Sequence, residues 1–441
     1  MYWKGVPRRN SFSYLWGIIP DLSRRIIVFG KSNIKAYVLA ALIAAAASVC
    51  CMPLPVSAED LSGQENWMRA AAEEVLREAE PIEREFRRRA LDPEGASAII
   101  SSSGKALTRE DGKWVTPGEQ PDSDQEISIV FVGDIIFETG QNPWSSIAYS
   151  DGIRACFDDE TWDTLTGADF LIVNNEFPYT DRGTPTPGKT FTFRCPPWTA
   201  EWLKEMGTDI AALANNHVYD YGEQGAMDTF DALDEQGIPY IGAGRNIDDA
   251  SSTAYCIANG TTIAILNATE IERYENPDTR EAEEDSPGVF RMLDTSWLCD
   301  KIREAKEKAD LCIVYAHWGT EKMPSADWSQ TTKAEELVEA GADLVVGSHP
   351  HVLQNIEYVD GVPVFYSLGN YFFGAAARDT GVLRVTVNTA DPSISALQFI
   401  PMLQYRGVST MEGSEKQRVL DEMSSVSPGV VIDEDGYFTE E

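Results

Sequence analysis

The sequence has few residues that could bind a metal through sulfur or cross-link the chain. It contains seven cysteines among 441 residues, and the five after residue 58 show no Cys-x-x-C spacing: Cys156, Cys195, Cys256, Cys299 and Cys312. This pattern argues against a thiolate zinc site and against a fold held together by several disulfides. A single disulfide among these residues stays open, although Cys312 lies inside an apolar run and is expected in the core.

Positive charge is also scarce. The chain has 36 Lys and Arg against 71 Asp and Glu, which gives a net charge of −35. Residues 1–58 hold seven of the bases and one acid, so their removal takes the net charge from −35 to −41. Such a field opposes binding to nucleic acids and to anionic surfaces. An anionic substrate would therefore need a local source of positive charge, and a metal ion is the most direct one.

A long apolar run occurs near the N-terminus. It covers residues 36–56, follows the bases of residues 1–35, and leads to Val56-Ser57-Ala58, a small-residue sequence typical of signal cleavage. Residues 1–58 are therefore predicted to be a signal peptide or a membrane anchor, and both alternatives stay open. Either one places the rest of the chain on the extracellular side of the cytoplasmic membrane, anchored or secreted.

The remaining chain divides into three segments by composition. Residues 59–126 predict a helix at 64–90 and then a linker rich in Ser, Gly and Pro. Residues 127–405 alternate short apolar runs with helical stretches, which is typical of an α/β domain. Residues 406–441 are predicted to be an acidic extension that ends in a solvated tail at 433–441. The helices predicted in the α/β domain cover 199–206, 222–236, 295–309 and 330–340.

Only four histidines occur, and all four have the same kind of position. They lie in Asn-Asn-His at 215–217, His-Trp-Gly at 317–319 and His-Pro-His at 349–351, and each motif follows a short apolar run. Such runs predict buried parallel strands, whose carboxyl ends are where α/β proteins bind ligands. Asp134 and Glu176 follow apolar runs in the same way. The sequence therefore predicts one polar centre.

The residue types at this centre suit a metal. Imidazole, carboxylate and amide oxygen together favour divalent ions such as Mn, Fe or Zn. His349 and His351 are separated by a proline and cannot share a helical face. On an extended loop, each of them could reach one of two neighbouring ions.

A series of short motifs runs through the predicted α/β domain. They are Gly133-Asp134, Asn174-Asn175-Glu176, Asn215-Asn216-His217 with Asp220-Tyr221-Gly222, Gly242-Ala243-Gly244, His317-Trp318-Gly319, Ser348-His349-Pro350-His351 and Tyr366-Ser367-Leu368-Gly369-Asn370. In these motifs the sequence from residue 127 to residue 403, roughly two-thirds of the chain, resembles the bacterial CapA family, which is associated with poly-γ-glutamate capsule synthesis. That family is similar in turn to the calcineurin-like metallophosphoesterases, so the resemblance implies a four-layer α/β/β/α sandwich with a two-metal site at the strand ends.

The resemblance also implies roles for individual residues. His217 would be free to protonate a leaving group as a general acid. The related esterases usually carry Asp-x-His in the first motif, whereas this chain has Asp134-Ile135-Ile136. One metal position is therefore expected to be poorer or differently completed. The implied ligands are Asp134 for one ion, Glu176 as the bridging carboxylate, Asn216 and His317 for the other ion, and His349 and His351 to complete the pair.

Four further residues are candidates for binding substrate. Arg182, Lys189 and Arg194 lie in the Gly-, Pro- and Thr-rich loop after Glu176, where cations in an acidic protein could hold an anion. The alternative is an ordinary flexible loop with scattered bases. Asn370, in the last motif, is the fourth candidate. The expected partners are an anionic polymer or phosphoester substrate, the membrane through the N-terminal segment, and capsule-synthesis membrane proteins, with no nucleic acid.

Two functions stay open from the sequence. The first is a cell-envelope protein of poly-γ-glutamate capsule biosynthesis that acts as a metal-dependent hydrolase or transferase, using a dinuclear centre to activate water against a γ-glutamyl or phosphoester bond. The second is a nonhydrolytic capsule-assembly or polymer-binding subunit with a structural or vestigial metal site. Retention of the six candidate ligands favours the first function, whereas the missing Asp-x-His histidine and the strong negative charge count against it.

Overall fold

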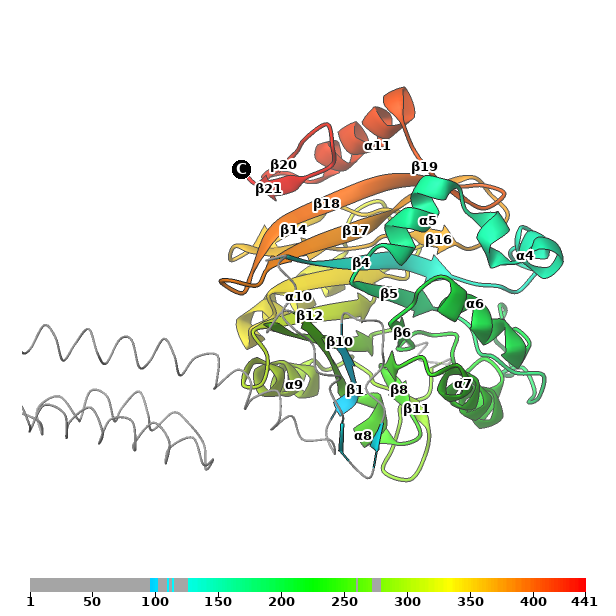
Figure 1. The fold of residues 1–441 in the computed structure, drawn as a ribbon. Coiled ribbons are helices and arrows are strands. Elements are labelled where there is room, and N and C mark those ends of the chain that lie inside the picture. The colour runs from blue at the N-terminus through cyan, green and yellow to red at the C-terminus, as the bar shows by residue number, and fades with distance from the viewer. Residues whose placement is uncertain (1–95, 102–108, 111–112, 115–125, 259–260, 272–278) are drawn as a thin grey trace, which may run out of the picture. The chain divides into compact units, whose positions relative to one another are not determined.

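The computed structural model describes residues 96–101, 109–110, 113–114, 126–258, 261–271 and 279–441 (Figure 1). All of them lie in one compact unit of the chain, Arg89–Glu441. Among these residues, no helix is both long and apolar enough to cross a membrane. The predicted signal peptide or anchor and the predicted helix at 64–90 fall outside the described residues.

One sheet has eight strands and is parallel in its centre. Its order is β19-β18-β17-β4-β5-β6-β7, and β16 pairs with β4 beside this path. Strands β4 to β7 run parallel, as does β16 with β4, whereas β17 pairs antiparallel with both β4 and β18. The bounds are β4 Glu126–Ile135, β5 Phe170–Asn175, β6 Ile210–Ala212, β7 Tyr240–Ile241, β16 Asn370–Phe372, β17 Arg378–Asn388, β18 Ser393–Gln404 and β19 Val408–Thr410.

A second sheet has seven strands in the order β1-β9-β10-β12-β13-β15-β14. Its central strands β10, β12, β13 and β15 run parallel, and antiparallel pairs lie on either side of them. The bounds are β1 Ala96–Ser101, β9 Thr253–Ala258, β10 Thr261–Thr269, β12 Leu311–His317, β13 Leu344–Ser348, β14 Ile356–Val359 and β15 Val362–Phe365. Short two-stranded pairs complete the strands: β2 Arg109–Glu110 with β3 Lys113–Trp114, β8 Ala243–Gly244 with β11 Gly288–Val289, and β20 Val430–Ile432 with β21 Phe438–Glu440.

Three apolar clusters show how the layers stack. Ile129 and Phe131 of β4 belong to a cluster that also contains Ile313 of β12, so this face of β4 lies against the second sheet. Val130 and Val132 face the other way and cluster with residues of helices α6 and α7, as the two-residue period of a strand requires. The outer face of the second sheet packs in the same manner against α9 and α10. The two sheets therefore lie face to face with helices on both outer faces, and the predicted α/β fold is confirmed.

The helices end where the sequence places termination signals. Gly237 and Gly341 follow α7 and α10 with φ of 70° and 112°, the left-handed backbone typical of a C-terminal cap. Asp327 and Gln330 form a capping box at the start of α10. The α-helices are α4 Ser145–Asp151, α5 Asp159–Thr166, α6 Glu201–Glu205, α7 Gly222–Gln236, α8 Ile247–Ala250, α9 Ser296–Lys306, α10 Trp328–Ala340 and α11 Gly413–Val426, with 3-10 turns at Ile153–Cys156 and Pro197–Ala200.

The segment predicted to be a linker contributes to a sheet. Strand β1 pairs in parallel with β9, with Ile100 opposite Cys256. Strands β2 and β3 form an antiparallel pair further along the same segment. The prediction at 92–126 followed the overall Ser, Gly and Pro content and so overlooked the short Ala-Ile-Ile run within it.

The C-terminal segment belongs to the folded core. Helix α11 buries Val419, Leu420 and Met423, and β21 buries Phe438, all in the cluster that includes the space between the sheets. The acids predicted in the tail at 433–441 are exposed, but the segment is not a free tail, because β21 and the buried Phe438 attach it to the core. Apolar residues lie at core-facing positions among acids that remain exposed, and the acidic composition concealed this pattern.

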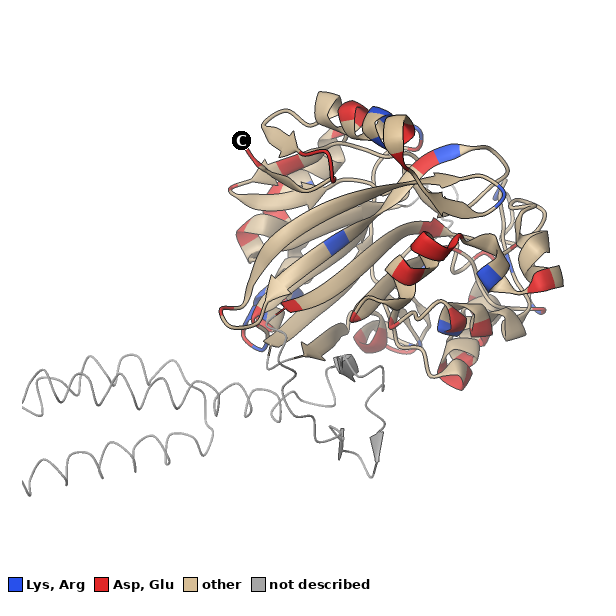
Figure 2. Cartoon of the chain, turned by 45° about the horizontal axis from the view of Figure 1, so that its top comes forward, with Lys and Arg blue, Asp and Glu red and all other residues tan. Residues whose placement is uncertain are grey.

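Acidic residues are marked on several of the outer helices (Figure 2). Helix α7 carries five Asp or Glu and no Lys or Arg. A strongly acidic helix of this kind at the surface favours solubility.

The five cysteines after residue 58 are all buried and free. Cys312 lies in β12 within the cluster beneath α9 and α10, so its predicted core position is confirmed. The single disulfide that the sequence left open does not form among these five residues.

A hydrogen bond joins the two sheets close to the carboxyl ends of their strands. The hydroxyl of Tyr315 in β12 donates to the carbonyl oxygen of Val132 in β4 over 2.5 Å. The Tyr315 ring also meets Phe131 edge to face, with ring centroids 5.6 Å apart. Two residues further along each strand, the side chains become polar.

Candidate metal centre

Strand ends from both sheets meet at one polar centre. Strands β4, β5 and β6 deliver residues from the first sheet, and β12 and β13 deliver residues from the second. Because the carboxyl ends of parallel strands lie at one edge of a sheet, side chains far apart in the sequence gather there. The residues brought together are Asp134, Glu176, Asn216, His217, His317, His349 and His351.

One group of metal-ligating atoms is centred on His317. Glu176, His317 and His349 each offer an atom within 4.8 Å of the others. The Nε2 atom of His317 lies 3.6 Å from Glu176 Oε1, 3.2 Å from His349 Nδ1 and 2.9 Å from Asn216 Oδ1. The other ring nitrogen, Nδ1, lies 3.0 Å from the hydroxyl of Ser348, which holds the ring with Nε2 toward the centre.

A second group is centred on Asp134 and shares Glu176 with the first. Asp134, Glu176 and His351 offer atoms within 4.8 Å of one another. The Nδ1 atom of His351 lies 3.0 Å from Asp134 Oδ2 and 2.8 Å from Asn370 Oδ1. The second oxygen of Asp134 accepts a hydrogen bond from Asn174 Nδ2 over 2.8 Å, which fixes the orientation of the carboxylate.

Glu176 has the strongest requirement for a cation. Its side chain is fully buried, and neither carboxylate oxygen has a hydrogen-bond partner among the residues that the structure describes. Burial, together with the neighbouring Asp134 carboxylate, raises the pKa of Glu176 well above its usual range. An unpaired buried carboxylate is costly, whereas two cations on either side of it would stabilise the charge.

The histidines of the centre present lone pairs. Burial and the adjacent imidazoles hold the pKa values of His317 and His349 well below the usual range, so both rings are neutral at pH 7. His351 differs, because burial alone would lower its pKa but the hydrogen bond and charge of Asp134 raise it overall. Neutral imidazoles with carboxylate and amide oxygens are a donor set that fits divalent metal ions.

The loop after β13 is folded tightly. His349 and His351 have φ of 97° and 59°, in the left-handed region that non-glycine residues seldom occupy. The loop is thus bent at both histidines, and the two rings reach different groups of donor atoms. Backbone strain of this kind is common where a binding site fixes side-chain positions.

His217 faces the centre and is held there by contacts with Asp220 and Phe193. Its Nε2 atom lies 4.0 Å from Glu176 Oε1, while its Nδ1 atom is held by Asp220 Oδ2 at 2.8 Å. The ring of Phe193 stacks on the imidazole with centroids 4.2 Å apart. Burial lowers the pKa of His217, an effect that Asp220 opposes and Lys189 reinforces.

The candidate substrate-binding residues fall into two pairs. Lys189 and Asn370 are part of the framework: Lys189 pairs with Asp220 at 2.5 Å and donates to the carbonyl of Asn216, and Asn370 contacts His351. Arg182 and Arg194 lie further along the loop. The exposed Arg182 pairs with Asp228 of α7, and the Arg194 guanidinium lies 4.6 Å from the ring centre of Tyr221.

Several residues of the centre were not assigned roles from the sequence. Asp220 was named only as part of a family motif, although its position three residues after His217 could have indicated its role. Asn174, directly before the strand-end pair Asn175-Glu176, had a similar positional signal. Phe193 gave no signal, because its place on His217 depends on the path of a long loop.

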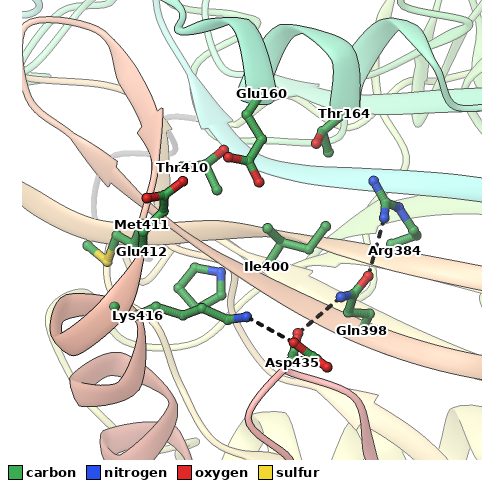
Figure 3. A pocket seen from close by; sticks show the side chains of 12 residues that line it. Glu160, Thr164, Arg384, Gln398, Ile400, Thr410, Met411, Glu412, Lys416 and Asp435 are labelled. Atoms are coloured by element: carbon green, nitrogen blue, oxygen red, sulfur yellow. Dashed lines mark hydrogen bonds and ion pairs between the residues drawn. The ribbon is translucent and has the colours of Figure 1, made fainter.

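A separate pocket of about 350 Å³ lies between α5, β18 and α11 (Figure 3). None of its lining residues belongs to the polar centre. Lys416 pairs with Asp435 at 3.5 Å, and Arg384 donates to Gln398 at 3.3 Å. Because Glu160 and Glu412 also line it, the pocket has no excess positive charge for an anion.

Comparison with known proteins connects this centre to a family. The model of the family described as bacterial capsule synthesis protein PGA_cap matches residues 128–375. A PGA biosynthesis protein CapA from Bacillus subtilis is 33% identical over 264 residues, which cover 59% of this chain and 67% of that protein. A capsule biosynthesis protein CapA from Bacillus anthracis is 35% identical over 224 residues, which cover 49% of this chain and 52% of that protein.

Among solved structures, the chain is similar to a phosphatase from Mycoplasma pneumoniae with a TM-score of 0.39 and 14% sequence identity, covering 64% of this chain and 94% of that one. It is also similar to a 5′-nucleotidase from Candida albicans with a TM-score of 0.34 and 12% sequence identity, covering 61% of this chain and 53% of that one.

Proposed function

We propose that this chain, which belongs to the PGA_cap family of bacterial capsule synthesis proteins, is a metal-dependent hydrolase or transferase of capsule biosynthesis in the cell envelope. Its substrate would contain a γ-glutamyl or phosphoester bond within an anionic polymer or ester. The observation that carries this proposal is the buried carboxylate of Glu176, which lies between two groups of metal-ligating atoms and has no hydrogen-bond partner among the described residues.

The donor atoms support two divalent ions, with Mn, Fe or Zn best suited to the ligand types. Ions held by these residues would supply Lewis-acid chemistry, polarising the bond to be broken and lowering the pKa of water at the centre. The two face-to-face sheets with helices outside support a four-layer sandwich of metallophosphoesterase type. The ligands proposed for one ion are Asp134, Glu176 and His351, and those for the other are Glu176, Asn216, His317 and His349.

We assign His217 the role of proton donor to the leaving group. Its Nε2 atom faces the centre, and Asp220 holds Nδ1 and so fixes both the tautomer and the ring orientation. Phe193 stacks on the ring and limits its contact with water. Burial lowers the pKa of His217, and the Asp220 carboxylate opposes this lowering and so favours the protonated ring that a proton donor requires.

The charge distribution supports different roles for Lys189 and for the arginines of the loop in binding an anion. Lys189 is close to the centre, but its ammonium is paired with Asp220 and its side chain is only 4% exposed. Attraction for the substrate would therefore come from the bound ions, with Arg182 and Arg194 further out on the loop. This arrangement would allow a protein of net charge −35 to bind a polyanion at one place.

The cell-envelope location rests on the N-terminal sequence. The basic residues, the apolar run at 36–56 and the small residues that follow it favour a signal peptide or an anchor, with the catalytic unit on the extracellular side. Membrane proteins of capsule synthesis would then be the natural partners. This part of the proposal draws on residues outside those that the structure describes.

The test uses the purified full chain and its His217→Gln variant, loaded with Mn²⁺. Hydrolysis of phosphoester model substrates and of poly-γ-glutamate is measured together with bound metal. Because the variant loses its proton donor but no metal ligand, we expect turnover to fall by ~10²–10⁴-fold with unchanged metal content. Glu223→Gln, an exposed change in the first turn of α7, is the control and should keep full activity.

Wild-type turnover in His217→Gln would remove this residue from the mechanism. A parent that binds two ions but converts none of these substrates, and instead binds poly-γ-glutamate, would favour the nonhydrolytic assembly subunit over the hydrolase.

A further inference from the structure

The two proposed ion sites are unequal in their donors. The site around His317 has four donor residues, whereas the site around Asp134 has three: Asp134, Glu176 and His351. The histidine expected two residues after Asp134 is replaced by Ile136, which is fully buried in the apolar cluster on the helix side of the sheet. Any further donor to the Asp134 site must therefore come from another part of the chain.

Strand β16 brings such a donor beside Asp134. Asn370 is opposite Asp134 in the parallel pairing of β16 with β4, and the Asp134 amide donates to the Gly369 carbonyl over 2.9 Å. This close approach depends on Gly133, because a Cβ atom there would lie 2.0 Å from the Gly369 oxygen. The backbone is thus arranged to place the Asn370 side chain at the centre.

The amide of Asn370 is oriented with its oxygen inward. Its Nδ2 atom donates to the carbonyl of Phe373 over 3.2 Å, so Oδ1 faces the opposite way. That oxygen lies 2.8 Å from Nδ1 of His351, and the residue is 8% exposed. The amide is therefore held by the fold and is not free to rotate in solvent.

Three electron-pair donors converge at this point. His351 Nδ1 faces both Asn370 Oδ1 and Asp134 Oδ2, yet a ring nitrogen carries at most one hydrogen and cannot make two full hydrogen bonds. Asp134 Oδ1 is already bonded to Asn174, which leaves Oδ2 for the centre. A cation among these atoms would use all three lone pairs at once.

We infer that Asn370 is a metal ligand that completes the Asp134 site in place of the histidine absent at position 136. The inference rests on the proposed two-metal centre. The Asp134 site then combines two carboxylates, one amide oxygen and one imidazole, an oxygen-rich set of the kind that suits Mn²⁺. The His317 site, with two imidazoles, is the more zinc-like of the pair.

The test measures Mn²⁺ binding to the metal-depleted full chain by calorimetry, with free Mn²⁺ counted by electron paramagnetic resonance. Asn370→Leu keeps the side-chain size but removes the oxygen, so one of two sites should weaken by ~10–100-fold and the other should not change. Asn370→Asp retains an oxygen at the same place and should bind two ions at least as tightly as the parent. Asn388→Leu, at the far end of β17, is the matched control.

The outcomes separate this inference from the proposed function. A parent that binds no Mn²⁺ overturns the two-metal centre itself. A parent with two ions and an Asn370→Leu variant with the same two affinities overturns only the assignment of Asn370. The melting temperature in chelator checks that Asn370→Leu folds. If it does not, weakened binding by Asn370→Asp overturns the inference, and parent-like or tighter binding supports it.

Discussion

Individual side chains at the centre are fixed by buried partners, and Lys189 is the clearest case. Its position in a loop rich in Gly, Pro and Thr suggested a mobile cation for substrate. Instead its side chain is 4% exposed and pairs with Asp220, which in turn holds His217. The pair Lys189–Asp220 thus joins the loop after β5 to the loop after β6.

Loss of the ion pair between Lys189 and Asp220 should destabilise the folded protein strongly. We expect Lys189→Met to lower the free energy of unfolding by ~3 kcal/mol, because the buried Asp220 carboxylate loses its counter-charge. Urea unfolding in the presence of a chelator measures the change without a contribution from metal. Lys204→Met, at an exposed lysine of α6, should change stability by less than ~0.5 kcal/mol, and an equal effect in both variants would contradict the role given to Lys189.

The sequence predicts the ligand positions of the centre but not their partners. Each candidate ligand lies at or shortly after the end of an apolar run, so strand periodicity and the rule for carboxyl ends locate it. The partners Asp220 and Phe193 are chosen by the three-dimensional path of loops, which has no periodic signal. The same holds for Asn370, whose place beside Asp134 depends on a pairing of strands more than two hundred residues apart.

Among the structural elements, four parallel strands are each preceded by an aspartate that makes the same hydrogen bond. An aspartate directly before each strand accepts a hydrogen bond from a backbone amide of the adjacent strand, at distances of 2.7 to 2.9 Å. This contact satisfies an amide at the amino end of the sheet, where the strand ladder ends. The aspartates are Asp169 before β5, Asp209 before β6, Asp310 before β12 and Asp343 before β13.

The hydrogen bond at Asp209 makes a contribution to stability that depends on pH. Burial raises its pKa to about 7, against the opposing effect of its hydrogen bond from the Leu171 amide. A raised pKa in the folded state means that the folded protein binds the proton more tightly than the unfolded chain. The contribution of Asp209 to stability is therefore complete below about pH 4 and is lost as the pH rises through 7.

Asp209→Asn should remove this dependence. The asparagine oxygen can still accept from the Leu171 amide but cannot ionise, so at pH 8 we expect the variant to be more stable than the parent by ~2 kcal/mol. At pH 4 the two should be nearly equal. Unfolding free energies in chelator across this range give the difference, and Asp163→Asn, at an exposed position of α5, serves as the comparison. A parent–variant difference that does not change with pH would contradict the prediction.

Elements with strong periodic or capping signals were predicted well. Helix α7 occupies the predicted residues 222–236, because its amphipathic pattern ends at a glycine that adopts the left-handed conformation. Strand β1 and helix α11 were not predicted. In both segments polar composition outweighs a few apolar residues; β1 is fixed by its pairing with β9, and the apolar residues of α11 are buried against the sheets.

At the scale of the whole molecule, the C-terminal segment closes the core. Leu420 of α11 and Phe438 of β21 belong to the same apolar cluster as residues of both sheets. The family match ends at residue 375, so this closure lies beyond the matched region. The segment is therefore a structural part of the folded unit that holds the polar centre.

Leu420→Ala tests this role. Removing a side chain that is 2% exposed should lower the free energy of unfolding by ~2–4 kcal/mol, through lost burial and the cavity that remains. Val431→Ala, at a residue that is 52% exposed in β20, should have a small effect. Thermal or urea unfolding measures the stability of both variants against the parent. A Leu420→Ala protein as stable as the parent would show that α11 is not part of the cooperative fold.

The hydrogen bond from Tyr315 to Val132 has a consequence for the chemistry. Donor atoms from two separate sheets must keep their positions to within about 0.5 Å for a reaction centre to work. Any sliding of one sheet along the other would change the distances between Asp134 and the histidines of β12 and β13. The Tyr315 bond resists such sliding two residues before the donors on each strand. The apolar packing between the two sheets thus determines how precisely the donor atoms are placed, although it contributes no atom to the polar site itself.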